Sequence, residues 1–170
     1  NKSRASFDEV INAIVQDIDE VKDNLVEDWK SEGYSDMDGR LTKGAALSIK
    51  ARALLYAASP LFNPENNKEK WERAAAASHD IIAMNRYKLH TSYKTLFTTK
   101  ITNTSKETIW AIRMGQTNDF ERANYPVGTP GGGTGICPSQ NLVSEYEYKT
   151  APSEDNPYEG LDPRFEFTIV

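Results

Sequence analysis

A short polar and aromatic stretch holds the residues of this sequence best suited to binding a ligand. Asn118, Phe120, Arg122 and Tyr125 fall within eight positions, and Tyr158 follows an Asn-Pro pair further along the chain. An aromatic ring can stack on the apolar face of a sugar while amide or guanidinium groups hydrogen-bond its hydroxyls. We therefore expect these five residues to be ligand-binding candidates. Packing of the same rings onto the rest of the fold is the alternative.

The residue types that catalysis or metal binding would need are sparse. Cys137 is the single cysteine, and His79 and His90 are the two histidines. None of them has the spacing of a zinc site or of a recognisable catalytic motif, and we interpret Cys137 as a buried thiol. The glycines from Gly128 to Gly135 lack the Gly-Lys-Ser/Thr ending of a phosphate-binding loop, so we expect a flexible loop there. The sequence thus predicts no catalytic residue, no metal, no cofactor and no enzyme activity.

Composition limits the class of protein further. The chain has 170 residues, 38% of them hydrophobic and 26% charged, with a net charge of -5. Such an acidic balance argues against a nucleic-acid partner, which would require a basic face. No apolar stretch approaches the roughly 20 residues of a membrane span. The chain begins with Asn1, without an initiator Met or a signal peptide, and we interpret it as an internal fragment of a longer protein.

The first half of the chain is predicted to be helical. Ser6 and Glu9 form a capping box, and apolar residues then recur at three- and four-residue steps as far as Leu25. A second helix is expected over Thr42–Ser59, where alanine and leucine cover nearly the whole circumference, so we expect it to be buried on most sides. Pro60 ends this helix.

A third helix follows Asn67 and runs to about Met84, with Asn85 as a left-handed cap. A short helical turn is expected over Ser92–Phe97. We predict that Trp29 and Trp71 lie on apolar helical faces and belong to the core, together with Trp110.

The second half of the chain is expected to be rich in loops. Thr108–Met114 and Phe165–Val170 have the β-branched and aromatic content of strands. Asn118–Pro138 is predicted to be a long loop, Ser139–Tyr146 a short capped helix, and Lys149–Pro163 irregular.

These elements predict a mainly α fold with long loops and a few short strands. Residues 1–100 form its helical portion, and residues 101–170 form a loop-rich portion of the same domain with short strands and a short helix. Alanine-rich helices that end at proline favour an array of helical hairpins of the tetratricopeptide kind.

Several sequence blocks resemble the RagB/SusD family, and they follow that family's order along the chain. The most specific are KARALLYAASPLFN at 50–63, which follows GRLTKGAA at 39–46, and DPRF at 162–165. Trp71 with the alanines after it, PSQNLV at 138–143 and NPY at 156–158 add to the likeness.

That resemblance implies a tetratricopeptide-like fold and a role for the parent protein. The parent would be a lipoprotein on the outer surface of the outer membrane, attached through a lipid anchor that this chain lacks. It would capture an oligosaccharide or polysaccharide for a SusC-type TonB-dependent transporter. The alternative is a structural helical-repeat module that binds a protein partner or a nutrient other than a glycan.

Overall fold

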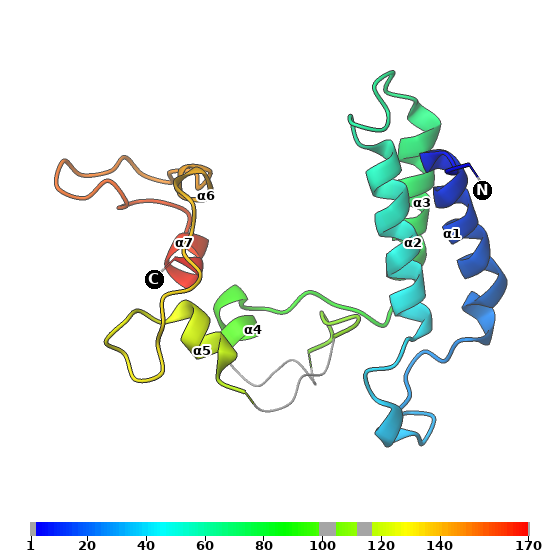
Figure 1. The fold of residues 1–170 in the computed structure, drawn as a ribbon, viewed down its shortest axis with the longest axis horizontal. Helices are drawn as coiled ribbons and strands as arrows, with labels where there is room; N and C mark the ends of the chain where they lie inside the picture. Colours follow the sequence, from blue (N-terminus) through cyan, green and yellow to red (C-terminus); the bar gives the residue numbers. More distant parts are fainter. Residues whose placement is uncertain (1–2, 99–104, 112–116, 170) are drawn as a thin grey trace. The chain divides into compact units, whose positions relative to one another are not determined.

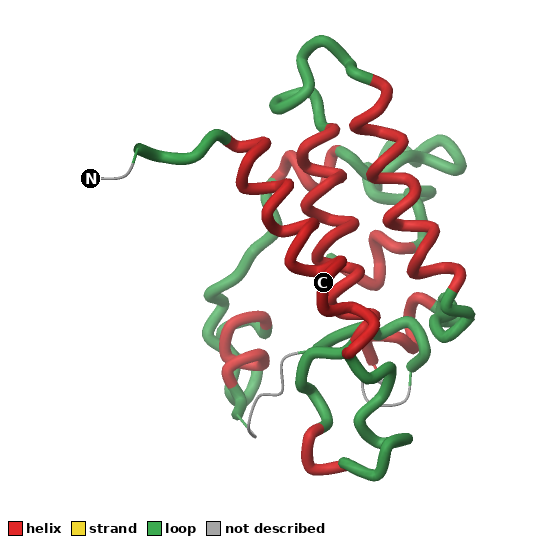
Figure 2. Tube along the Cα trace, turned by 90° about the vertical axis from the view of Figure 1, so that its right-hand side faces the viewer, coloured by secondary structure: helices red, strands yellow, loops and turns green. Residues whose placement is uncertain are grey.

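The computed structural model describes residues 3–98, 105–111 and 117–169, and these residues are mainly helical. The chain divides into two compact units. Unit 1 comprises residues 1–91 and 100–113, and unit 2 comprises residues 92–99 and 114–170. In the parts of the chain that are described, extended pairing is limited to one isolated antiparallel bridge, between Tyr148 and Leu161 (Figure 2). The mainly α class is therefore confirmed, whereas the predicted short strands are not found among the described residues.

Three helices of unit 1 lie side by side (Figure 1). They are α1 (Phe7–Val21), α2 (Lys43–Ala58) and α3 (Lys68–Ala83), and each runs antiparallel to the next. The 3-10 turns η1 (Lys22–Asn24) and η2 (Ser35–Met37) lie in the connection between α1 and α2. The helical bounds agree with the predicted ones to within a few residues.

The ends of these helices are fixed by local side chains. Ser6 accepts from the backbone of Glu9, whose carboxylate accepts from the Ser6 N–H, so the predicted capping box is present. The Ser6 hydroxyl also donates to the Glu9 carboxylate at 2.7 Å, and this hydrogen bond, together with that from the Ser6 N–H, holds the pKa of Glu9 below its ordinary value. Asn67 caps α3, and Asn85 after it takes the left-handed conformation with φ of 52°.

The core lies between α2 and α3 and consists largely of alanine. Small side chains let the two helix backbones approach closely, and leucine and isoleucine fill the space toward α1. The buried residues of this cluster are Ile11, Ala51, Leu54, Ala57, Ala58, Ala74 and Ala77. Helix α2 was expected to be buried on nearly all sides, but Ile49, Leu55 and Tyr56 are exposed, because α1 and α3 cover only part of its circumference.

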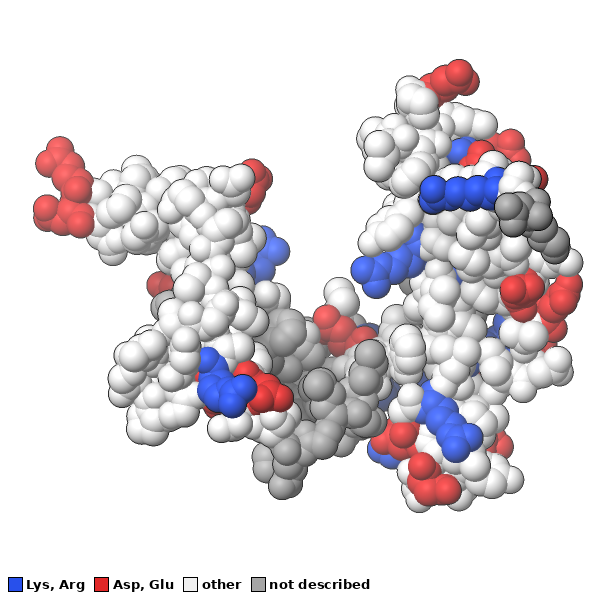
Figure 3. All heavy atoms as spheres, in the orientation of Figure 1, with Lys and Arg blue, Asp and Glu red and all other residues white. Residues whose placement is uncertain are grey.

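Ion pairs link α1 to the other two helices. Lys50 of α2 contacts Asp19 of α1 at 2.7 Å, and Lys70 of α3 contacts Asp8 at 3.0 Å. On the face drawn in Figure 3, some acidic and basic side chains lie next to each other, and other acidic ones lie alone. Among the described residues, no helix has the length and apolar character needed to cross a membrane.

The described residues of unit 2 form four short helices and long connections. They are α4 (Tyr93–Thr98), α5 (Asp119–Asn124), α6 (Gln140–Ser144) and α7 (Arg164–Thr168). Aromatic contacts hold α7 in place, since Phe165 packs edge-on to Tyr146 at 5.4 Å and Phe167 lies 6.5 Å from Tyr93.

Two predicted strands are corrected by the structure. The segment predicted as a strand over Phe165–Val170 is helical up to Thr168, because Pro163 at the N-cap and Asp162, which accepts from the Arg164 N–H, turn the chain into a helix. The predicted strand Thr108–Met114 has no strand in its described part, 108–111, and its remainder lies outside the described residues.

The glycine-rich segment of unit 2 also differs from its prediction. The long loop predicted over Asn118–Pro138 contains α5, and its glycines form a turn that is fastened back onto that helix. Gly135 and Ile136 both donate to the Ala123 carbonyl, at 2.8 and 2.7 Å. Cys137, which follows this turn, is exposed rather than buried, because it lies in the connection to α6 and not against a helix face.

Candidate functional site

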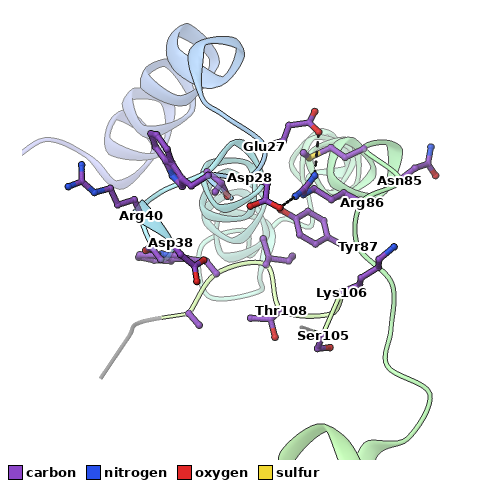
Figure 4. A pocket seen from close by; sticks show the side chains of 17 residues that line it. Glu27, Asp28, Asp38, Arg40, Asn85, Arg86, Tyr87, Ser105, Lys106 and Thr108 are labelled. Atoms are coloured by element: carbon purple, nitrogen blue, oxygen red, sulfur yellow. Dashed lines mark hydrogen bonds and ion pairs between the residues drawn. The ribbon is translucent and has the colours of Figure 1, made fainter. Parts of the chain in front are cut away.

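A cleft of about 530 Å³ opens in unit 1, and three segments of chain line it. The first is the connection from η1 to α2, the second follows the end of α3, and the third is the described segment 105–111 (Figure 4). The three segments come from sequence positions far apart, so the cleft exists only in the folded unit.

The first wall is a connection whose two ends are joined by a backbone hydrogen bond. Lys43 donates its N–H to the Val26 carbonyl at 2.9 Å, which closes the segment into a loop. Inside it, the Trp29 indole N–H donates to the Leu41 carbonyl at 3.2 Å. The half-buried indole of Trp29 is thereby fixed in the wall, with the ring of Tyr34 edge-on at 6.2 Å.

The second wall begins where α3 ends. Because Asn85 takes a positive φ, the chain turns sharply and brings Arg86 and Tyr87 to the cleft. The Tyr87 ring packs against Gly44 at the start of α2, where even a Cβ atom would collide with it. Burial there raises the pKa of the Tyr87 phenol above its ordinary value, since the anion would lose hydration.

The third wall is joined to both of the others. The backbone N–H of Lys88 donates to the Lys106 carbonyl at 3.1 Å, and the backbone N–H of His90 donates to the Glu107 carboxylate at 2.6 Å. On the other side, the Trp110 indole N–H donates to the Gly39 carbonyl at 3.0 Å. The ring of Trp110 is therefore oriented although half of its surface, 50%, stays exposed.

Charged side chains of both signs line the cleft. Arg86 contacts Asp28 at 2.5 Å and Glu27 at 3.9 Å (Figure 4). Asp38 contacts Lys30 at 3.0 Å. Arg40 and Lys106 also line the cleft, and both are exposed.

The arrangement suits a polar ligand that also has an apolar face. Two indole rings held by hydrogen bonds provide flat apolar surface, and the side chains around them offer hydrogen-bond donors and acceptors. No cluster of three or more potential metal ligands occurs in the described part of the chain. The cleft can therefore hold and orient a ligand by stacking and hydrogen bonding.

The five residues that sequence composition favoured all lie in unit 2, and none lines the cleft. Asn118 immediately precedes α5, and its carbonyl accepts from the Arg122 N–H at 3.0 Å. Phe120 on α5 is 67% exposed, and Arg122 reaches Asp119 at 3.8 Å. Tyr125 follows the helix and is partly exposed.

Tyr158 belongs to a different part of unit 2. Its ring stacks on Phe165 at 5.6 Å with one half of its surface exposed, and Figure 1 shows its connection well separated from α5. The structure thus brings Asn118, Phe120, Arg122 and Tyr125 together around one short helix and leaves Tyr158 apart.

Two residues of the cleft were assigned to the core from sequence. Trp29 lies in a turn after η1 and not on a helix, and Trp110 is half exposed at the cleft. The placement of Trp29 between Asp28 and Lys30 was a usable signal, because a core tryptophan seldom has charged neighbours on both sides. Trp110 follows Ile109 and precedes Ala111, so its neighbours gave no such signal.

Compared with protein-family models, curated proteins and solved structures, the chain gives no match. The resemblance to the RagB/SusD family rests on the sequence blocks alone.

Proposed function

We propose that this chain is part of a SusD-like cell-surface protein that binds an oligosaccharide in the cleft of unit 1. The observation that carries the proposal is the pair of indole rings, Trp29 and Trp110, fixed by backbone hydrogen bonds in an open cleft with charged and polar walls. Saccharides combine apolar ring faces with many hydroxyl groups, and this cleft offers partners for both.

The proposed architecture of the parent protein follows from the sequence blocks. The antiparallel α2–α3 pair with its alanine-rich core supports a tetratricopeptide-like hairpin, and the PLFN end of the 50–63 block forms the turn between these helices. By the same resemblance, the parent would be lipid-anchored at the outer surface of the outer membrane and would pass its ligand to a SusC-type TonB-dependent transporter. We expect binding without turnover, so that the sugar is recovered unchanged.

A second function is favoured by the exposed side of α2. Ile49, Leu55 and Tyr56 of α2 are each left exposed by α1 and α3, with the Arg52 guanidinium over the Tyr56 ring. Such a surface fits a structural helical-repeat module that docks a protein partner, or a protein that binds a nutrient other than a glycan. This alternative predicts that no sugar changes the melting temperature of the chain.

The proposal is tested by oligosaccharide binding to the full chain and to Trp110→Ala. Removal of an exposed stacking ring should weaken binding about tenfold. Trp71→Ala is the matched control, because Trp71 is a partly exposed tryptophan of α3 that does not line the cleft. Circular dichroism should show both variants folded.

The five residues predicted from sequence provide the competing site. If Phe120→Ala and Tyr158→Ala weaken binding while Trp110→Ala does not, the ligand binds in unit 2 and the cleft assignment is wrong. If no sugar in a broad panel binds the wild-type chain, the proposed function fails and the docking module becomes the better account.

A further inference from the structure

We infer that the saccharide bound in the unit 1 cleft is acidic, carrying carboxylate or sulfate groups. This inference rests on the proposed function and adds the chemical class of its ligand. It comes from which charged side chains of the cleft are already paired and which are not.

The aspartates of the cleft are already engaged with cations. Asp28 forms its ion pair with Arg86 at 2.5 Å, and Asp38 forms one with Lys30 at 3.0 Å. Glu27 lies 3.9 Å from the same Arg86. A neutral sugar is usually held by carboxylates that accept from its hydroxyl groups, and here each of the two aspartates already uses one oxygen for a cation.

Two cations of the cleft are not engaged in this way. Within residues 3–98, 105–111 and 117–169, the side chains of Arg40 and Lys106 form no ion pair or hydrogen bond. Both are exposed, so they are available to a ligand. The cleft therefore offers two cations that no acid of the described residues pairs with, on a chain whose net charge is -5.

The positions of these two cations suggest an extended ligand. Figure 4 shows Arg40 and Lys106 at opposite edges of the cleft, with the Asp28–Arg86 pair between them and with their charged ends pointing outward, so they are cations of the rim. An oligosaccharide with acidic groups on more than one ring could present one of them to each edge. Arginine and lysine bind carboxylate and sulfate through charge-assisted hydrogen bonds, which are stronger than their bonds to neutral hydroxyls.

The inference is tested with paired ligands. A panel of uronate-containing oligosaccharides is compared with the same molecules after reduction of their carboxyl groups, and sulfated oligosaccharides with their desulfated forms. Binding to the full chain is measured by calorimetry at low salt and at about 0.5 M salt, where surface charges are strongly screened. We expect at least one acidic ligand to bind about tenfold more tightly than its neutral partner, and to weaken with salt.

Variants assign the effect to the two cations. Arg40→Gln and Lys106→Gln should each reduce the preference for the acidic ligand, and the double variant should remove most of it. Lys68→Gln is the control, since Lys68 is 87% exposed on α3 and does not line the cleft. Comparing the affinities of the uronate-containing and the sulfated oligosaccharides shows which anionic group the cleft prefers.

The outcomes separate this inference from the proposed function. If neutral oligosaccharides bind as tightly as their acidic partners, the inference is overturned and sugar binding stands. If acidic ligands are preferred but neither cleft variant changes that preference, the inference is overturned as well, because the charge lies elsewhere. If no sugar of either kind binds, the proposed function and this inference both fail.

Discussion

At the scale of single residues, the close contact between Gly44 and Tyr87 holds the second wall of the cleft against α2. A Cβ atom at position 44 would collide with the hydroxyl and ring carbons of Tyr87, so this ring fits only over a glycine. Gly44→Ala should destabilise the chain by about 1–3 kcal/mol through overpacking and should shift Tyr87. Thermal unfolding measures the cost, and ligand binding reports the shift of the wall.

A double-mutant cycle shows whether the collision is the cause. In a Tyr87→Leu background the ring is gone, so Gly44→Ala should cost much less and can even be stabilising, since alanine favours helix over glycine. An equal cost of Gly44→Ala in both backgrounds would mean that position 44 requires glycine for some other reason.

Asp19 makes the stability of unit 1 depend on pH. Hydrogen bonds from Lys22 and Lys50 hold the pKa of Asp19 below its ordinary value. A carboxyl whose pKa is lower in the folded state contributes stability above its unfolded pKa near 4 and loses that contribution as the pH falls. We expect Asp19→Asn to lower stability at pH 7 by about 1 kcal/mol or less, and the difference from wild type to shrink below pH 4.

The control for this prediction is another acid on the same helix. Asp17 is exposed, and the structure gives it no ion pair with any described residue, so Asp17→Asn should leave the acid dependence unchanged. Melting temperatures of the three proteins between pH 2 and pH 7 decide the matter. Parallel curves for wild type and Asp19→Asn would show that the ion pairs of Asp19 with Lys22 and Lys50 contribute nothing.

At the scale of elements, Asn63 organises the turn between α2 and α3. It is 5% exposed, and its amide donates to the carbonyls of Ala58 and Asn67, at 3.3 and 3.1 Å. The side-chain oxygen Oδ1 of Asn63 accepts from the Asn67 backbone N–H at 2.8 Å. Asn63→Ala should therefore cost about 1–3 kcal/mol, because buried backbone groups lose their partners.

The matched control for the turn is Glu65→Ala. Glu65 is exposed in the same connection, and a surface change there should stay within about 0.5 kcal/mol. Urea unfolding of both variants measures the difference. A cost for Asn63→Ala no larger than that for Glu65→Ala would show that the three hydrogen bonds do not hold the hairpin together.

The elements that could be predicted are those that local residues specify. Ser6 with Glu9 begins α1, Pro60 follows the end of α2, and Asn85 ends α3, and each of these acts within a few positions of itself. Helix α7 was missed because Phe165 and Phe167 alternate with Glu166 as they would in a strand. Its helical conformation depends on Asp162 and Pro163 before it and on rings brought by other segments.

The cleft could not be predicted for the same reason. Its walls contain Trp29, Arg86 and Trp110, and no pattern within a short window relates these three positions. Composition could point only to Asn118–Tyr125 and to Tyr158 beside its Asn-Pro pair, where suitable residues are adjacent in sequence. A site built from distant segments becomes visible only when backbone hydrogen bonds such as Lys88 to Lys106 are known.

At the scale of the whole molecule, the buried core is unevenly divided between the two units. All of the buried apolar residues in the described ranges belong to unit 1, and the cluster around Ala57, Ala74 and Leu54 is the largest part of them. In unit 2 the described side chains are half-buried or exposed, and its helices are held by aromatic pairs such as Tyr158 with Phe165. The two units should therefore differ in stability.

Native-state hydrogen exchange can measure that difference directly. Amides of α2 and α3 are expected to exchange only through large-scale unfolding of unit 1, because their hydrogen bonds surround its core. Amides of α5, α6 and α7 should exchange within about a factor of ten of the unprotected rate, since little apolar burial opposes their local opening. Equal protection in both units would contradict this division and would require apolar burial in unit 2 that its described side chains do not provide. A saccharide that binds the unit 1 cleft should raise protection in α2 and α3 and leave α5 unchanged, whereas one that binds around Phe120 should do the reverse.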